Sequence, residues 1–274
     1  MCRWAAYSGK PVHIEEIVAS PRHSLIEQSQ AASECKTSVN GDGFGLAWYG
    51  DRPEPGLYRD ILPAWSDCNL RNIARQVRSP LFLAHVRAST GTPTNRQNCH
   101  PFVMGHWAFM HNGQIGGFTH LRRALEEKLS DALYQVRFGS TDSELLFLLA
   151  LQEGLEEAPA RALMKAVETV LETAQRLSVE PLVRLTAALS DGRQLHAVRY
   201  STDAICPTLY VSQETIGEGW CLVSEPLDRQ DSRWAAVEPG TFITVSGAEM
   251  RCEPFGRQNA SSRGKHRQLA ESAA

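Results

Sequence analysis

The sequence lacks a marked excess of either charge and has no long hydrophobic run. Its 274 residues carry 28 lysines and arginines against 31 aspartates and glutamates, a net charge of −3, which argues against nucleic acid or an anionic membrane as partner. No stretch of about 18 apolar residues occurs, so no membrane span is predicted. The start, MCRWAAYSGKPVHIEE, lacks the apolar core of a secretory signal. These absences predict a globular protein of the cytoplasm.

Paired metal-ligand and phosphate-loop motifs are missing as well. The seven cysteines are odd in number, widely spaced and without C-x-x-C, which speaks against a disulfide framework or a zinc ribbon. His85, His100 and His111 show neither H-x-H nor H-E-x-x-H spacing, so we expect no metal site. The glycine-rich segment Asn40–Gly45 is not followed by Lys and Ser or Thr, so we expect no phosphate-binding loop.

The periodicity of apolar residues predicts one α+β domain over residues 2–255 and a polar, unanchored tail over 256–274. The short polar connections suggest two sheets with helices packed outside. Expected strands are Cys2–Ser8, Phe44–Tyr49, Leu81–Val86, Trp107–His111 and a β-rich stretch from Val183, with Asp191-Gly192 as a two-residue hairpin turn. Expected helices are Ser24–Ser33, Leu70–Val77, Leu121–Leu129, one that begins at Thr141 with a capping box, and one with an apolar stripe from Leu163 to Leu177.

Cys2 stands directly behind the initiator methionine. Cytosolic processing removes Met1 readily when a small residue follows, and the mature chain would then begin with a thiol and a free α-amine on one residue. An α-amine has a pKa of about 7.7–8.0, so it can accept a proton near neutral pH. The pair could activate a nucleophile without a separate histidine. Position alone also allows Cys2 to have no role.

Three further positions carry two interpretations each. Arg87, in HVRAST, suits bidentate binding of a carboxylate, or is a solvated arginine at a strand end. Asn112-Gly113 is either a hairpin turn or an oxyanion hole made of the Asn112 amide and the Gly113 N–H. Asp142 either favours the helix dipole in the first turn of a capped helix or binds a substrate ammonium group. The residues alone leave each pair open.

The order of the motifs is more specific than any one of them. Cys2, NGDGFG, HVRAST, NCHPF, HNGQI and STDSE follow one another as in the glutaminase domain of class II glutamine amidotransferases, which the chain resembles from Cys2 to about Leu151. These enzymes are N-terminal-nucleophile hydrolases, and MCRWAAYSG and GDGFGLAWYG are most similar to stand-alone members that lack a synthase domain. The resemblance implies a four-layer αββα sandwich with Cys2 at the edge of one central sheet.

The same resemblance implies the catalytic residues. Cys2 becomes the nucleophile and its α-amine the base, while Asn112 and Gly113 form the oxyanion hole. The thiolate attacks the γ-carboxamide carbon, ammonia or an amine leaves, and water releases glutamate from a γ-glutamyl thioester. The resemblance requires no metal and no organic cofactor.

It also implies the substrate-binding residues. Arg87 would hold the α-carboxylate of the substrate and Asp142 its α-ammonium group. Thr90 would help to line the pocket, and His100, which matches a family motif residue, is placed with them. Opposite charges at the two ends of the amino-acid moiety would fix the γ-glutamyl group in position.

The resemblance leaves the physiological reaction open. The protein could hydrolyse glutamine or another γ-glutamyl amide, like the ergothioneine-pathway hydrolase that removes glutamate from a conjugate. It could instead supply ammonia to a separate synthase as partner protein. A non-catalytic protein that senses a ligand is the third alternative, and it would bind glutamine without turnover or retain Met1.

Overall fold

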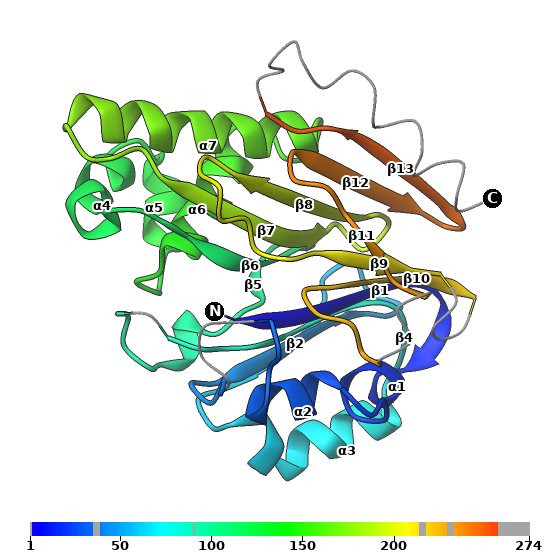
Figure 1. Cartoon of the computed structure of the whole chain (residues 1–274). Helices are drawn as coiled ribbons and strands as arrows, with labels where there is room; N and C mark the ends of the chain where they lie inside the picture. The colour runs from blue at the N-terminus through cyan, green and yellow to red at the C-terminus, as the bar shows by residue number, and fades with distance from the viewer. Residues whose placement is uncertain (1, 35–38, 90, 214–217, 229–232, 257–274) are drawn as a thin grey trace.

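The computed structural model describes residues 2–34, 39–89, 91–213, 218–228 and 233–256. Two antiparallel sheets lie face to face, and helices cover the outer face of each sheet (Figure 1). Helices α1 to α3 pack on one sheet, and α6 and α7 on the other. The resemblance predicted this four-layer αββα arrangement, and the structure confirms it.

Sheet A contains the N-terminal strand in its interior. In the described part of the chain it has seven strands, in the order β11 (Ala235–Ala236), β9 (Tyr210–Ser212), β10 (Gly219–Val223), β1 (Arg3–His13), β4 (Arg78–Val86), β2 (Phe44–Tyr49) and β3 (Gly56–Asp60). Its outer face packs against α1 (Glu15–Val18), α2 (Leu25–Gln30) and α3 (Cys68–Gln76). The start of β1 therefore lies between β10 and β4, near the centre of the sheet.

Sheet B is formed by the later strands. Its six described strands run in the order β13 (Glu249–Pro254), β12 (Thr241–Ser246), β8 (Leu195–Ser201), β7 (Val183–Ser190), β6 (Trp107–Ile115) and β5 (Phe102–Met104). The helices on its side are α4 (Phe118–Glu126), α5 (Asp131–Gln135), α6 (Asp142–Gln152) and α7 (Pro159–Arg176), and two 3-10 turns cover Ala64–Ser66 and Arg96–Asn98.

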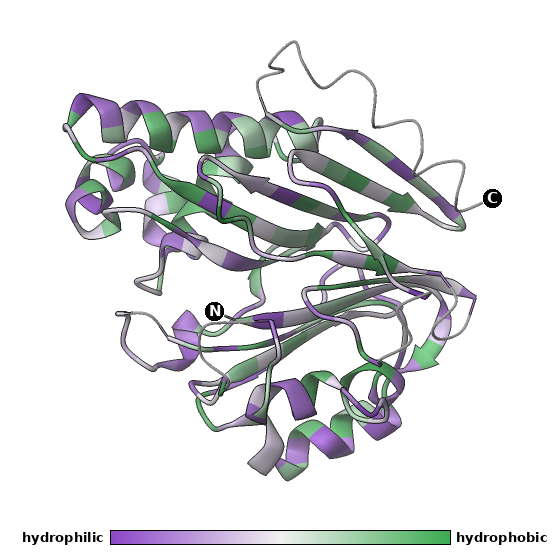
Figure 2. Ribbon diagram, in the orientation of Figure 1, coloured by the Kyte–Doolittle hydropathy of each residue, from purple (hydrophilic) through white to green (hydrophobic). Residues whose placement is uncertain are grey.

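Three apolar layers hold the sandwich together. One lies between the sheets and includes Trp4, Leu83 and Met110, and one lies between each sheet and its helices. Figure 2 shows hydrophobic residues along the strands and mixed hydrophobic and hydrophilic residues around α7, as expected for an amphipathic helix on a sheet. Burial of these faces on both sides of each sheet fixes the register of the strands.

The structure corrects several sequence predictions. Asn112 and Gly113 do not form a hairpin turn: they lie inside β6, opposite Thr186 and Leu185 of β7. The loop between β7 and β8 has four residues, because Ser190 pairs with Leu195, not the two that Asp191-Gly192 suggested. Strands β3, β5 and β13 and helices α1 and α5 were not predicted, because they are short or carry too few apolar residues to show a period.

The start of α6 with Thr141 as its N-cap was predicted correctly, but the Glu144 carboxylate accepts the N–H groups of Phe138 and Gly139 instead of closing a capping box. Thr141 Oγ1 accepts a hydrogen bond from the Glu144 N–H at 3.1 Å. The predicted polar tail lies outside the described residues from position 257 onward. None of the helices in the described ranges is both long and apolar enough to cross a membrane.

Candidate active site

Cys2 lies directly before β1, and its side chain points toward sheet B. Trp4, the next residue on the same side of the strand, is buried between the sheets, and side chains alternate between faces along a strand. The Cys2 Sγ donates a hydrogen bond to the backbone oxygen of Ala88 at 3.6 Å. Burial raises the pKa of the thiol, and the Ala88 contact and the charges of Arg87 and Arg3 reverse this only in part. Cys2 is therefore a thiol that needs a base.

Arg87 follows β4 and lies level with Cys2 in the register between β1 and β4. It is buried, with 3% of its surface exposed. Its Nη atoms donate to four uncharged oxygens: Asp42 O at 3.2 Å, Ser89 Oγ at 3.1 Å, Thr92 Oγ1 at 2.7 Å and Pro93 O at 3.4 Å. Among the described residues the guanidinium forms no ion pair within 4.0 Å. A buried cation without a counter-ion is costly, so this environment suits a bound carboxylate.

A second row of residues lies one step deeper between the sheets. Trp4, His85 and Gly45 are neighbours across β1, β4 and β2. Trp4 Nε1 donates to the backbone oxygen of Thr186 at 3.3 Å, which places this row opposite β7 of sheet B. These three residues lie next to Cys2 on the side of the sandwich interior, and we call them the floor of the site.

His100 completes this floor. Its ring centroid lies 4.2 Å from that of His85, and its backbone passes so close over Gly45 that a Cβ there would collide with the His100 carbonyl. Both rings are buried, and none of their four nitrogens has a hydrogen-bond partner in the described part of the chain. Burial lowers the pKa of His85 to about 3 and that of His100 well below its ordinary value. Both imidazoles are therefore neutral at working pH.

Asn112 and Gly113 lie on the facing strand β6. Asn112 is the register partner of Thr186, which contacts Trp4, so its side chain faces the same end of sheet A as Cys2. It is buried, and neither its Nδ2 nor its Oδ1 has a partner among the described residues. A Cβ on Gly113 would collide with the carbonyl of Arg184, so only glycine fits. An unpartnered buried amide is costly and is available to a developing oxyanion.

Asp142, at the start of α6, ties the helix to β6. Its Oδ2 accepts the Ile115 N–H at 2.8 Å, and its Oδ1 accepts the Ser143 N–H at 2.8 Å. Alternate N–H groups along a strand point the same way, so the Gly113 N–H is directed to the same edge as that of Ile115. Carboxylate oxygens have further lone pairs, which leaves capacity for an ammonium group.

His111 is fixed on the other face of β6. Its Nδ1 lies 2.9 Å from Ser143 Oγ and its Nε2 3.0 Å from the backbone oxygen of Arg184. A carbonyl only accepts, so Nε2 carries a proton and donates it to the Arg184 oxygen. Burial lowers the pKa of His111, and the Asp142 charge opposes this. Asn112 is thus held by anchored residues on both sides.

The structure thus brings most of the predicted residues to one end of the sandwich. Cys2 and Arg87 lie on sheet A, Asn112 and Gly113 face them from β6, His100 lies at the floor and Asp142 at the start of α6. Thr90 lies outside the described residues. The sequence predicted no role at this site for Asp42, Arg3 or Glu225, and it raised His85 only as a possible metal ligand. The contacts of these residues join segments far apart in the chain.

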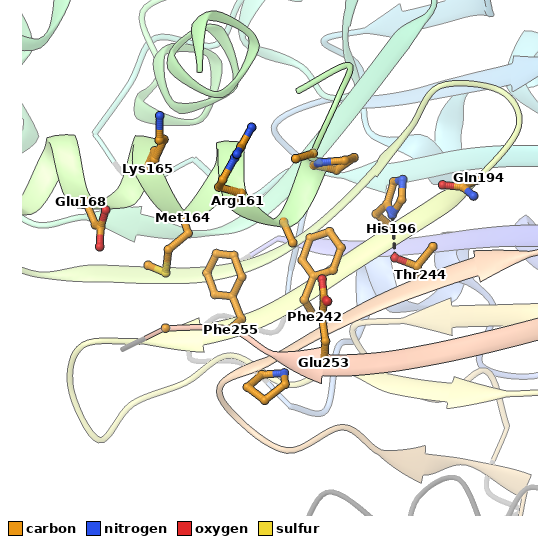
Figure 3. Close-up of a pocket in the computed structure, with 15 residues that line it drawn as sticks. Arg161, Met164, Lys165, Glu168, Gln194, His196, Phe242, Thr244, Glu253 and Phe255 are labelled. Carbon is orange, nitrogen blue, oxygen red and sulfur yellow. Dashed lines mark hydrogen bonds between the residues drawn. The ribbon is translucent and has the colours of Figure 1, made fainter. Parts of the chain in front are cut away.

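No group of three or more His, Cys, Asp or Glu side chains that could hold a metal occurs in the ranges described. A cavity of about 710 Å³ lies elsewhere, between α7 and the outer face of β8, β12 and β13 (Figure 3). His196 and Thr244 meet there, with 3.0 Å between His196 Nδ1 and Thr244 Oγ1. None of the predicted site residues lines this cavity.

The comparisons with known proteins agree with this geometry. Residues 24–213 match the family model for "Glutamine amidotransferases class-II". The chain belongs to this family. A protein named as a probable glutamine amidotransferase in Saccharomyces cerevisiae is 30% identical over 93% of this chain and 84% of its own length.

Two further relatives are similar over most of the chain. The "Gamma-glutamyl-hercynylcysteine sulfoxide hydrolase" of Mycolicibacterium smegmatis is 28% identical over 93% of this chain and 100% of its own. The solved structure of a glutamine aminotransferase class-II domain protein from Silicibacter pomeroyi has a TM-score of 0.75 at 42% identity, and covers 93% of this chain and 100% of that one.

Proposed function

We propose that this amidotransferase cleaves the γ-carboxamide of L-glutamine or a related γ-glutamyl amide through a γ-glutamyl thioester on Cys2. The observation that carries the proposal is the position of two buried polar side chains at the same end of the sandwich. Arg87, a buried cation without a carboxylate partner in the described part of the chain, lies level with Cys2. Asn112, a buried amide without a partner among the same residues, faces them. The α-carboxylate of a γ-glutamyl amide would pair with Arg87. The oxyanion that forms when the amide is attacked would accept a hydrogen bond from Asn112.

The thiol is activated by the α-amine that removal of Met1 exposes. Because burial raises the pKa of the Cys2 thiol, the thiolate forms only when a base accepts its proton. The α-amine of the same residue has a suitable pKa of about 7.7–8.0. His85 and His100 are too strongly desolvated to accept this proton.

In the first half-reaction the sulfur bonds to the carbonyl carbon of the γ-carboxamide, and the carbonyl π electrons move onto oxygen. Asn112 Nδ2 and the Gly113 N–H hold this oxyanion. When it collapses the C–N bond breaks, and the ammonium formed on Cys2 gives its proton to the departing ammonia or amine. A γ-glutamyl thioester remains on Cys2.

In the second half-reaction water attacks the same carbon and gives a proton to the freed α-amine. The C–S bond breaks, the sulfur takes the proton back, and glutamate leaves. Arg87 on the α-carboxylate and Asp142 on the α-ammonium group keep the glutamyl moiety in place through both steps.

The glutamyl half of the substrate is common to glutamine and its conjugates, so the leaving group distinguishes the candidates. Hydrolysis of a γ-glutamyl conjugate is favoured by the similarity to the mycobacterial hydrolase over that protein's whole length. Transfer of ammonia to a separate synthase stays a prediction from the sequence.

A panel of γ-glutamyl amides, including L-glutamine, tests the proposal. Purified protein whose intact mass shows the loss of Met1 should release glutamate from at least one of them. Cys2→Ala should abolish release, and Cys68→Ala, which removes an exposed cysteine on α3, should leave it unchanged. Equal activity of wild type and Cys2→Ala would refute the proposal.

A further inference from the structure

The start of β1 is tied to the segment that follows β10. Chain ends usually fray unless other contacts hold them, and a nucleophile at residue 2 has a covalent neighbour on one side only once Met1 is removed. The Trp4 N–H donates to Ser224 Oγ at 2.9 Å, and the Ser224 N–H donates to the Trp4 oxygen at 3.0 Å. Ser224 therefore holds Trp4, the second residue after Cys2, through both its N–H and its carbonyl oxygen.

Arg3 connects Cys2 itself to the same segment after β10. Its side chain is completely buried on the helix side of sheet A, and its Nε lies 2.8 Å from Glu225 Oε2. Its Nη1 donates to the Cys2 backbone oxygen at 3.4 Å. Removing one partner of a buried ion pair is strongly destabilising, because it leaves the other charge uncompensated. The Arg3–Glu225 pair thus fixes the single peptide group that links Cys2 to the fold.

Glu225 is itself held from several directions. Its carboxylate lies 2.5 Å from His23 Nε2 and accepts the N–H groups of Ser33 at 2.8 Å and Glu34 at 3.1 Å. Burial alone would raise its pKa, but these donors and Arg3 lower it to about 2, so it is ionised at working pH. One carboxylate therefore joins the start of β1, the turn before α2 and the segment after α2.

We infer that Glu225 is a positioning residue for the nucleophile, which acts through Arg3 to fix the thiol and the α-amine of Cys2. This rests on the proposed role of Cys2. Both reactive atoms turn about the Cys2 backbone, and a misplacement of about 1 Å can cost 100-fold in rate. Glu225 contacts neither the substrate nor the reacting atoms.

The test compares Glu225→Gln with Val170→Ala, a cavity variant in α7 that destabilises the remote helical layer. Glu225→Gln keeps the size of the side chain and leaves Arg3 unpaired. We expect its kcat to fall about 10-fold or more with KM for the substrate within about twofold. Val170→Ala should keep both constants, and Glu225→Asp, which retains the charge, should recover part of kcat and also serves if the glutamine variant fails to fold.

A second readout needs no substrate. Iodoacetamide labelling of the N-terminal peptide, followed by mass spectrometry, should be faster in Glu225→Gln, because a loosened Cys2 is more accessible and the uncompensated Arg3 charge favours its thiolate. Exposed Cys68 should react at the same rate in both proteins, and buried Cys221 in neither.

A lower kcat together with faster labelling of Cys2 in Glu225→Gln supports the inference. Unchanged kcat, a matching loss in Val170→Ala, or unchanged labelling of Cys2 would overturn it. If the wild type cleaves no γ-glutamyl amide the proposed function fails instead, while the labelling rates still decide whether Glu225 holds Cys2.

Discussion

The backbone carbonyl of His100 occupies the space that a side chain on Gly45 would need. This contact places His100 against His85, the residue paired with Gly45 across β2 and β4. Gly43 is constrained in the same way, because a Cβ there would meet Cys99 Sγ at 2.6 Å. Gly43 and Gly45 of NGDGFG thus leave room for the Cys99-His100 segment.

Gly45→Ala should therefore lose both stability and activity. Relief of the overlap must displace the His100 segment, and overpacking of this kind costs about 1–3 kcal/mol. Urea unfolding and turnover of the best γ-glutamyl amide measure the two effects. Gly50→Ala, at the end of the same strand with open space around its Cβ, is the control and should match wild type. A fully active Gly45→Ala would show that the floor of the site does not depend on His100.

Arg87→Lys should weaken substrate binding. Lysine keeps the charge but loses the planar fork that binds a carboxylate with two hydrogen bonds. Because hydrogen bonds to charged groups contribute about 1.5–3 kcal/mol, we expect KM for L-glutamine to rise roughly 10- to 100-fold. Arg78→Lys, at the exposed start of the same strand, should leave KM unchanged.

The matched substrate for this experiment is γ-aminobutyramide, which lacks the α-carboxylate. Wild type and Arg87→Lys should cleave it with similar kcat/KM. An equal loss on both substrates would mean that Arg87 acts on the protein and not on the carboxylate.

Asn112→Ala should lose activity but little stability. The loss of one oxyanion donor typically lowers kcat 100- to 1,000-fold. The Asn112 amide has no partner among the described residues, so its removal leaves no hydrogen bond broken, and we expect the free energy of unfolding to change by less than about 1 kcal/mol.

Asn98→Ala is the contrasting variant. The Asn98 amide bonds to Pro93 O at 2.8 Å, Ser140 Oγ at 3.0 Å and the Ser140 N–H at 2.8 Å. Its loss should cost about 2–3 kcal/mol, because buried partners are left unsatisfied. If Asn112→Ala were the less stable of the two, Asn112 would be a structural residue.

Glu225 should make the free energy of unfolding fall as the pH is lowered. Its pKa is about 2 in the folded protein and 4.5 ordinarily. A lowered carboxyl pKa stabilises the fold above pH 4.5, and this stabilisation is lost as the pH falls toward 2. Wild type should lose roughly 2–3 kcal/mol more than Glu225→Gln over this window.

Urea unfolding at pH 7, 5, 4 and 3 measures this difference. Glu249→Gln, which removes an exposed ion pair with Arg251, should follow the wild-type curve. Parallel curves for wild type and Glu225→Gln would contradict the ionised, buried carboxylate.

The sequence predicted those features whose signal is local. The apolar run Leu81–Val86 and the N-cap at Thr141 need only neighbouring residues, and both are present in the structure. Asn112-Gly113 could not be decided locally, because the same dipeptide suits a turn and a strand. Only its register with β7 showed which one forms.

The sequence did not predict contacts between residues far apart in the chain. Nothing near Arg3 indicates that Glu225, more than two hundred residues away, is its counter-ion. The motif NGDGFG shows glycines but not the segment that passes over them. Strand β13 is mostly exposed, so it has no buried face to produce an alternating pattern.

The most direct test of this account is to trap the covalent intermediate. The enzyme is acid-quenched during turnover and its peptides are mapped by mass spectrometry. We predict a γ-glutamyl adduct on the sulfur of an N-terminal peptide that begins at Cys2 and lacks Met1. An active enzyme that retains Met1, or an adduct on any other residue, would contradict it.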